Sequence, residues 1–357
     1  MVTPEDVRRN LARVRFPGFQ RDIVALGVVR DVAVEGDRVV VHLTPGSTKA
    51  EVVAELRETI GRALESLEGV GAVEVRLPGD EARAAAARSP FDERAPLPGV
   101  AQVLAIASGK GGVGKSTIAV NLALALRARG TRVGLLDADI YGPSIPHMLG
   151  VADARPRMAE QKKIFPIERH GLSLISMGFF LDDRSPVIWR GPMVMSIIRQ
   201  FLKDVVWGDL DVLVVDLPPG TGDAQLTLMQ QVPVSGGLIV TTPQDVALQD
   251  VRRGISMFQA VATPVLGIVE NMSGYTCPSC GMREDLFGVG GGRREAEALG
   301  VPLLAEIPLV SEVRASMDRG EPIVVADPAD EVSRQFDALA AESLAALAAA
   351  ARAPLAN

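Results

Sequence analysis

The sequence predicts an α/β protein, with helices flanking a mostly parallel sheet, preceded by a small α+β domain. From residue 100 onward, short apolar strands alternate with helical patterns, and a Gly-rich loop follows the first of these strands. The residues before that point show a different order of elements. Of 357 residues, 47% are hydrophobic and 23% charged, ordinary values for a globular protein that buries a sizeable core.

The N-terminal segment, residues 1–77, shows the order α-β-β-α-β. A helix begins at Thr3-Pro4-Glu5-Asp6, where a hydroxyl cap precedes Pro and two acids in the first turn. Apolar spacing then predicts strands at 28–34 and 38–43, a helix at 47–67 and a strand at 72–77. This order predicts a compact α+β domain.

Residues 78–99 contain several prolines and an Ala-Arg tract, which indicate a linker. The domain at 100–357 follows it. Fully apolar strands are predicted at 103–107, 132–136, 212–215 and 238–241, as is typical of a parallel sheet buried on both faces. Helical patterns lie between them, for example at 116–129, and the Ala-rich residues 331–352 predict a helix packed on the sheet.

The Gly-rich loop matches the pattern G-x-x-x-x-G-K-[ST] between a strand and a helix, which indicates a P-loop that binds ATP. It reads Gly109-Lys110-Gly111-Gly112-Val113-Gly114-Lys115-Ser116. Glycines let backbone N–H groups turn toward phosphate oxygens, and the helix N-terminus adds positive dipole. We expect Lys115 to reach the β- and γ-phosphates, Ser116 to ligate Mg²⁺, and Thr117 to complete the nucleotide site.

A second lysine, Lys110, lies inside this loop. The pattern resembles the deviant Walker A loop of the family that contains the MinD and ParA ATPases and the nitrogenase iron protein. In that family the extra lysine reaches phosphates bound by the partner subunit, so the resemblance implies a homodimer that sandwiches ATP. Lys110 would then stabilise charge developing on the γ-phosphate, as an arginine finger does.

Acidic residues follow two of the apolar strands, at Asp137-Ala138-Asp139 and at Asp216. Carboxylates at the C-terminal ends of parallel strands face the ligand crevice of an open sheet. We expect Asp216 to join the Mg²⁺ shell through water, and the resemblance implies that Asp137 assists the metal while Asp139 orients the attacking water. Each could instead cap the next helix. Residues 218–223 suit a switch loop that senses the γ-phosphate.

The chain has two cysteines, Cys277 and Cys280, in a C-x-x-C pair. A zinc or iron–sulfur site with four thiolates needs four ligands, which a symmetric dimer with two such pairs on its axis would supply. Zinc between subunits, a redox disulfide and inert cysteines are the alternatives that the pair alone leaves open.

Several ordered motifs resemble one family, the Mrp/ApbC group of iron–sulfur cluster carrier ATPases, over residues 98–340. Beside the cysteine pair, they lie at 137–144, 189–193, 216–223, 242–247, 270–273, 287–292 and 307–309. The resemblance implies a [4Fe–4S] cluster held by Cys277 and Cys280 of two chains, received from cluster donors and delivered to apo-proteins. It also implies that Asn271 contacts the adenine.

Two other functions remain at this point: a positioning ATPase like MinD or ParA that works on membrane or DNA, and an ATPase with a structural zinc site between subunits. No basic amphipathic segment supports the first. Metal content would separate the second from a cluster carrier.

The N-terminal domain resembles the small iron–sulfur assembly domain that often precedes this ATPase, with the likeness carried by residues 22–29. The family's usual Asp-Pro-Glu reads Arg15-Phe16-Pro17-Gly18, and its Thr-x-x-Cys-Pro reads Thr44-Pro45-Gly46-Ser47-Thr48. Ser47 replaces a cysteine and is a poorer ligand for soft metals. This predicts a docking or structural role for the domain.

The net charge of −7 excludes a generally basic nucleic-acid footprint. No run of about 18 apolar residues occurs, and no apolar signal segment is visible near the N-terminus. Two closely spaced cysteines suit a reducing compartment. The sequence therefore predicts a cytoplasmic protein whose partners include neither nucleic acid nor membrane.

Overall fold

The computed structural model describes residues 2–17, 21–36, 38–44, 50–65, 67, 70–76, 96–140, 142–159, 163–180, 191–220 and 222–352. Ser47, Trp189 and Arg190 lie outside the described residues. The chain divides into two compact units, Met1–Ser89 and Pro90–Asn357.

The N-terminal unit contains a three-stranded sheet and two helices, in the order that the sequence predicts. They are α1 (Pro4–Leu11), β1 (Val29–Glu35), β2 (Arg38–Leu43), α2 (Ala50–Glu65) and β3 (Ala72–Arg76). Strand β2 lies centrally, antiparallel to β1 and parallel to β3. A capping box begins α1: the Thr3 hydroxyl accepts from the Asp6 N–H, and the Asp6 carboxylate accepts from the Thr3 N–H.

The larger unit is built on a nine-stranded sheet of order β13-β12-β11-β4-β10-β5-β9-β8, with β14 also paired to β12. Only β13 and β8 pair antiparallel, so the predicted, mostly parallel α/β sheet is confirmed. Its strands are β4 (Val100–Ala107), β5 (Val133–Asp137), β8 (Ile167–Arg169), β9 (Leu172–Ser176), β10 (Leu210–Asp216), β11 (Gly236–Thr241), β12 (Val265–Thr276), β13 (Arg283–Glu284) and β14 (Leu303–Leu309). A separate hairpin joins β6 (Arg157–Met158) to β7 (Ile164–Phe165).

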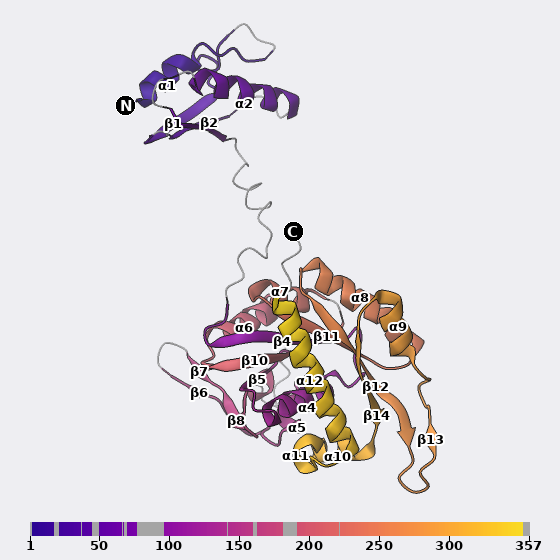
Figure 1. Ribbon diagram of the computed structural model, residues 1–357. Coiled ribbons are helices and arrows are strands. Elements are labelled where there is room, and N and C mark those ends of the chain that lie inside the picture. Colours follow the sequence, from indigo (N-terminus) through magenta and orange to yellow (C-terminus); the bar gives the residue numbers. More distant parts are fainter. Residues whose placement is uncertain are drawn as a thin grey trace. The chain divides into compact units, whose positions relative to one another are not determined.

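Helices cover both faces of this sheet, and Figure 1 shows α12 lying across it. They are α4 (Lys115–Ala128), α5 (Ile145–Met148), the 3-10 helix η2 (Met177–Phe179), α6 (Gly191–Lys203), α7 (Asp223–Gln231), α8 (Asp245–Ala260), α9 (Gly291–Leu299), α10 (Ser311–Asp318), α11 (Ile323–Ala326) and α12 (Glu331–Arg352). Successive side chains of a strand point to opposite faces. Leu104 of β4 therefore packs in the cluster that holds α4 and α12, whereas Val103 packs in the cluster that holds α6 and α8.

The predicted C-terminal helix is confirmed as α12. Its side chains Phe336, Leu339 and Leu347 are buried in the core cluster that also contains residues of α4 and of the sheet. Among the described residues, no helix has the length and apolar character needed to cross a membrane.

Strand register brings the polar strand ends together. Asp216 of β10 pairs with Asp137 of β5, and Asp137 pairs in turn with Ser176 of β9. The neighbouring strand β4 ends at Ala107, where the Gly-rich loop begins. Because parallel strands end at the same edge of a sheet, the loop and both carboxylates share that edge.

Candidate nucleotide site and cysteine hairpin

The Gly-rich loop winds tightly between α8 and β12. Gly112 and Gly114 both have φ of +82°, a left-handed conformation that favours glycine. A Cβ on Gly114 would lie 2.2 Å from the Asn271 amide nitrogen, and one on Gly109 would lie 2.1 Å from the Asp250 Cβ. These approaches and the two positive φ values account for Gly109, Gly112 and Gly114, whereas Gly111 has neither a positive φ nor an atom near its missing Cβ.

Lys115 and Ser116, the first residues of α4, both contact Asp216. The Lys115 Nζ lies 2.6 Å from one carboxylate oxygen of Asp216, and the Ser116 hydroxyl donates to the other at 2.5 Å. Lys115 is 6% exposed and Asp216 is fully buried. Burial raises the pKa of Asp216, and the Lys115 ammonium opposes that rise.

Asp137 is a second fully buried carboxylate. It accepts from the Ser176 hydroxyl at 2.8 Å and from the Asp139 N–H at 3.1 Å. Burial, followed by the nearby charge of Asp216, raises the pKa of Asp137 to about 8. Two buried carboxyl groups thus lie together, one of them paired with Lys115, and the Ser116 hydroxyl adds an oxygen; this set of hard oxygen ligands fits Mg²⁺.

A hollow of about 190 Å³ opens beside these groups. Its lining includes the loop, Thr117, Asp139 and Pro219. Lys110 also lines it, and its Nζ donates to the side-chain oxygen of Gln244 at 3.3 Å. The structure therefore places most of the predicted phosphate-loop residues, together with Asp139, around one small hollow, whereas Gly109 and Val113 do not line it.

The segment after Asp216 is tied to this hollow. The Gly220 N–H donates to the Ser108 carbonyl at 2.9 Å, and the buried Gln225 side chain donates to the Pro218 carbonyl. Thr221 lies outside the described residues. The sequence pattern singled out the segment but not Gln225, which no local motif marks.

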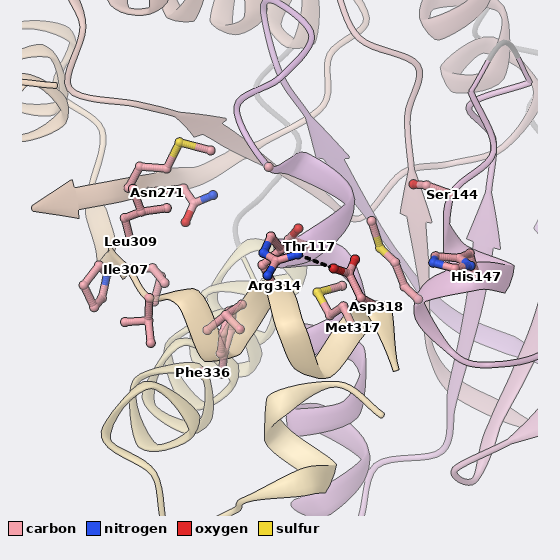
Figure 2. Close-up of a pocket in the computed structure, with 16 residues that line it drawn as sticks. Thr117, Ser144, His147, Asn271, Ile307, Leu309, Arg314, Met317, Asp318 and Phe336 are labelled. Atoms are coloured by element: carbon pink, nitrogen blue, oxygen red, sulfur yellow. Dashed lines mark hydrogen bonds and ion pairs between the residues drawn. The ribbon is translucent and has the colours of Figure 1, made fainter. Parts of the chain in front are cut away.

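A larger, mainly apolar cavity of about 350 Å³ adjoins the hollow and shares Gly114, Thr117, Ser144 and Met148 with it. Figure 2 shows the residues that line it; Asn271 and Leu309 come from strands β12 and β14, and Phe336 comes from helix α12. The Asn271 amide donates to the Val113 carbonyl at 2.9 Å, so this residue joins the loop to the cavity. Sequence reasoning missed Met317 and Phe336, which tertiary packing alone brings here.

The cysteine pair occupies the tip of the hairpin formed by β12 and β13. Strand pairing ends at Thr276 and Arg283, and the Gly281 N–H donates to the Cys277 carbonyl at 2.8 Å to close the turn. Cys280 is exposed and Cys277 is half-buried. Hydrogen bonds from the backbone N–H groups of Ser279 and then Cys280 lower the pKa of Cys277, which favours the thiolate needed to bind a metal.

Within the part of the chain that the structure describes, no group of three or more His, Cys, Asp or Glu side chains could hold a metal ion. The hairpin therefore presents two thiols without a third described ligand of these types. Exposed apolar side chains lie near it in sequence, at Met282, Leu286 and Val289.

A Gly-rich loop that opens a helix beside two strand-end aspartates defines this chain as a P-loop NTPase. The family model described as NUBPL iron-transfer P-loop NTPase matches residues 99–344. The model described as iron-sulfur cluster assembly protein matches residues 4–75.

Curated relatives match nearly the whole chain. The iron-sulfur cluster carrier protein of Haemophilus influenzae is 45% identical over 94% of this chain and 89% of its own length. The iron-sulfur cluster carrier protein of Escherichia coli is 42% identical over 95% of this chain and 92% of its own length. The chain belongs to this family of iron–sulfur cluster carrier P-loop NTPases.

A solved nucleotide-binding protein from Archaeoglobus fulgidus, in complex with ADP and with cobalt found, is 38% identical with a TM-score of 0.58. The similarity covers 69% of this chain and 96% of that one. The chain also shares its fold with the cell division ATPase MinD of Pyrococcus furiosus, which is 24% identical with a TM-score of 0.52. That similarity covers 69% of this chain and 99% of MinD.

Proposed function

We propose that this iron–sulfur cluster carrier binds and hydrolyses ATP as a homodimer and transfers a [4Fe–4S] cluster to apo-proteins. The observation that carries this proposal is the cysteine pair at the hairpin tip, where Cys280 is exposed and the described residues offer no third His, Cys, Asp or Glu ligand. A [4Fe–4S] cluster takes four thiolates. Two chains, each contributing Cys277 and Cys280, would supply them.

The two adjoining cavities suit one ATP molecule. The apolar 350 Å³ cavity suits the adenine, with the Asn271 amide at its edge, and the loop hollow suits the triphosphate. Ser116, Asp216 and Asp137 would hold Mg²⁺, directly or through water, and the ion would supply positive charge that stabilises the triphosphate. Lys115 would then exchange the Asp216 carboxylate for phosphate oxygens.

Hydrolysis breaks the bond between the γ-phosphorus and the bridging oxygen as water adds, giving ADP and phosphate. Asp139 lines the hollow, and its backbone is held by Asp137, so it can orient that water. Lys110 lines the same hollow and would reach the γ-phosphate bound by a facing copy.

The exposed hairpin suits a carrier because thiols of an apo-protein must reach the cluster to replace its ligands one by one. Cluster donors would approach the same tip. We place this activity in the cytoplasm, with no nucleic-acid or membrane partner. The N-terminal domain, residues 1–77, would dock partners at the end of the linker 78–99.

Anaerobic reconstitution with iron and sulfide tests the proposal. We expect the wild type to take up about four irons per dimer. Cys280→Ser should take up none, while the control Met282→Ala, changed at an exposed side chain of the same hairpin, should load normally. Stoichiometric zinc without cluster uptake, or a loaded protein that stays monomeric, would contradict the proposal.

A further inference from the structure

Lys110 has one hydrogen-bond acceptor for its ammonium among the described residues, the side-chain oxygen of Gln244. Gln244 occupies the N-cap position of α8, yet its side chain makes no capping bond. It is therefore available to Lys110. A neutral amide oxygen fixes the lysine side chain but leaves its charge unpaired, so phosphate oxygens should displace it readily.

Helix α8 is joined firmly to both the phosphate loop and α9. Gly109 lies so close to α8 that a Cβ there would overlap Asp250. Arg252 of α8 binds the Glu295 carboxylate of α9 through two bonds of 2.8 and 3.0 Å, and Figure 1 shows the two helices side by side. This two-bond geometry resists sliding, so a shift of α8 would move α9.

The first turn of α9 packs against the residue that precedes Gln244. A Cβ on Gly291 would lie 2.6 Å from the Pro243 carbonyl oxygen. On its other side, the Gly292 N–H donates to the buried Glu270 carboxylate of β12. Residues 285–290 then connect the start of α9 directly to the cysteine hairpin.

Two routes thus run from the loop to α9. The first passes from Lys110 through Gln244 and Pro243, and the second from Val113 through Asn271 and Glu270. Only the first contains a group that must change partners during the proposed reaction.

We propose that Gln244 is a positioning residue that couples the nucleotide site to the cysteine hairpin. Gln244 holds Lys110 until the phosphates of a facing copy take the lysine, and its release repacks α8 and α9 and changes the accessibility of Cys280. This inference rests on the proposed function, because Lys110 must act across a dimer.

The test measures how fast iodoacetamide alkylates Cys280 in the full-length, reduced, metal-free chain, with and without a non-hydrolysable ATP analogue. We expect the analogue to change the wild-type rate by about fivefold or more, within the ordinary range of coupling between sites. Gln244→Leu removes the acceptor at similar volume and should lose this response. Gln244→Glu places a carboxylate beside the Lys110 ammonium, which phosphate oxygens should displace less readily, so it should weaken the response. Gln249→Leu, the same change at an exposed glutamine of α8, is the matched control and should retain the response.

A response that persists in Gln244→Leu, or a wild-type rate indifferent to nucleotide, would overturn the inference. Dimer mass and iron uptake, measured on the same preparations, test the proposed function separately. If the wild type loads iron as a dimer but its nucleotide response of Cys280 alkylation does not depend on Gln244, only the proposed coupling is refuted. Wild type that stays monomeric refutes the proposed function as well.

Discussion

The phosphate loop and the cysteine hairpin each follow a strand of the same sheet, but they are completed in opposite ways. In the loop, the Lys115 ammonium and the Ser116 hydroxyl meet a fully buried carboxylate of their own chain. At the hairpin, Cys280 is exposed. The difference teaches that Lys115 and Ser116 of the loop find their partner inside the chain, whereas the cysteine pair leaves one thiol exposed to other molecules.

The largest expected effect follows from breaking the internal site. Lys115→Ala leaves Asp216 buried without its cation, which should lower the free energy of unfolding by about 3–5 kcal/mol. Nucleotide affinity should fall about 100-fold with the loss of charge-assisted bonds to phosphate. Urea unfolding and nucleotide titration measure both.

The control for Lys115→Ala is Lys163→Ala, because Lys163 is exposed and lies 3.9 Å from the Asp204 carboxylate. Its loss should cost less than about 1 kcal/mol. Iron uptake by the folded fraction of Lys115→Ala should match the wild type. If uptake fell in proportion to nucleotide affinity, loading of the cysteine pair would require the contact between Lys115 and Asp216.

Lys110→Ala should separate affinity from turnover. Lys110 makes no ion pair with the buried carboxylates, so nucleotide affinity should change by less than about threefold. Turnover should fall on the order of 100-fold, because a donor to developing phosphate charge is lost. Steady-state kinetics and nucleotide titration give both values. Equal losses in affinity and turnover would show instead that Lys110 already contacts the nucleotide before the reaction begins.

The same substitution in both regions sharpens the comparison. Gly114→Ala forces a left-handed alanine and brings its Cβ onto Asn271, so it should cost more than about 2 kcal/mol. Gly281 has φ of +72° but open space around its missing Cβ, so Gly281→Ala should cost only about 1 kcal/mol. Urea unfolding compares them, and equal costs would show that crowding around the loop contributes nothing.

The sequence could predict what is local. The phosphate loop lies in one continuous pattern, and apolar strands ending in Asp137 and Asp216 indicate one sheet edge. The α/β fold followed from the same strands. Cys277 and Cys280 could be counted as two ligands, but their exposure at a hairpin tip required the structure.

What the sequence could not predict depends on contacts between distant segments. Gln244 meets Lys110 across 134 positions, and Ser176 meets Asp137 across 39. No spacing rule connects such pairs, because strand order and helix packing bring them together. Phe336 reaches the apolar cavity from the last helix in the same way.

The smallest expected effect compares two aspartates at opposite ends of β10. Buried Asp216 has a raised pKa, whereas the exposed Asp211 accepts bonds from the Arg132 side chain and backbone, which lower its pKa from 3.8 to about 2. The lowered pKa means that this pairing stabilises the fold above about pH 4, and that the stabilisation is lost as the pH falls toward 2. Asp211→Asn should therefore be slightly less stable than wild type at pH 6, with the gap shrinking at pH 3. Urea midpoints at the two pH values measure this gap, and a gap that widens in acid would show that the Arg132 contact does not set the titration of Asp211.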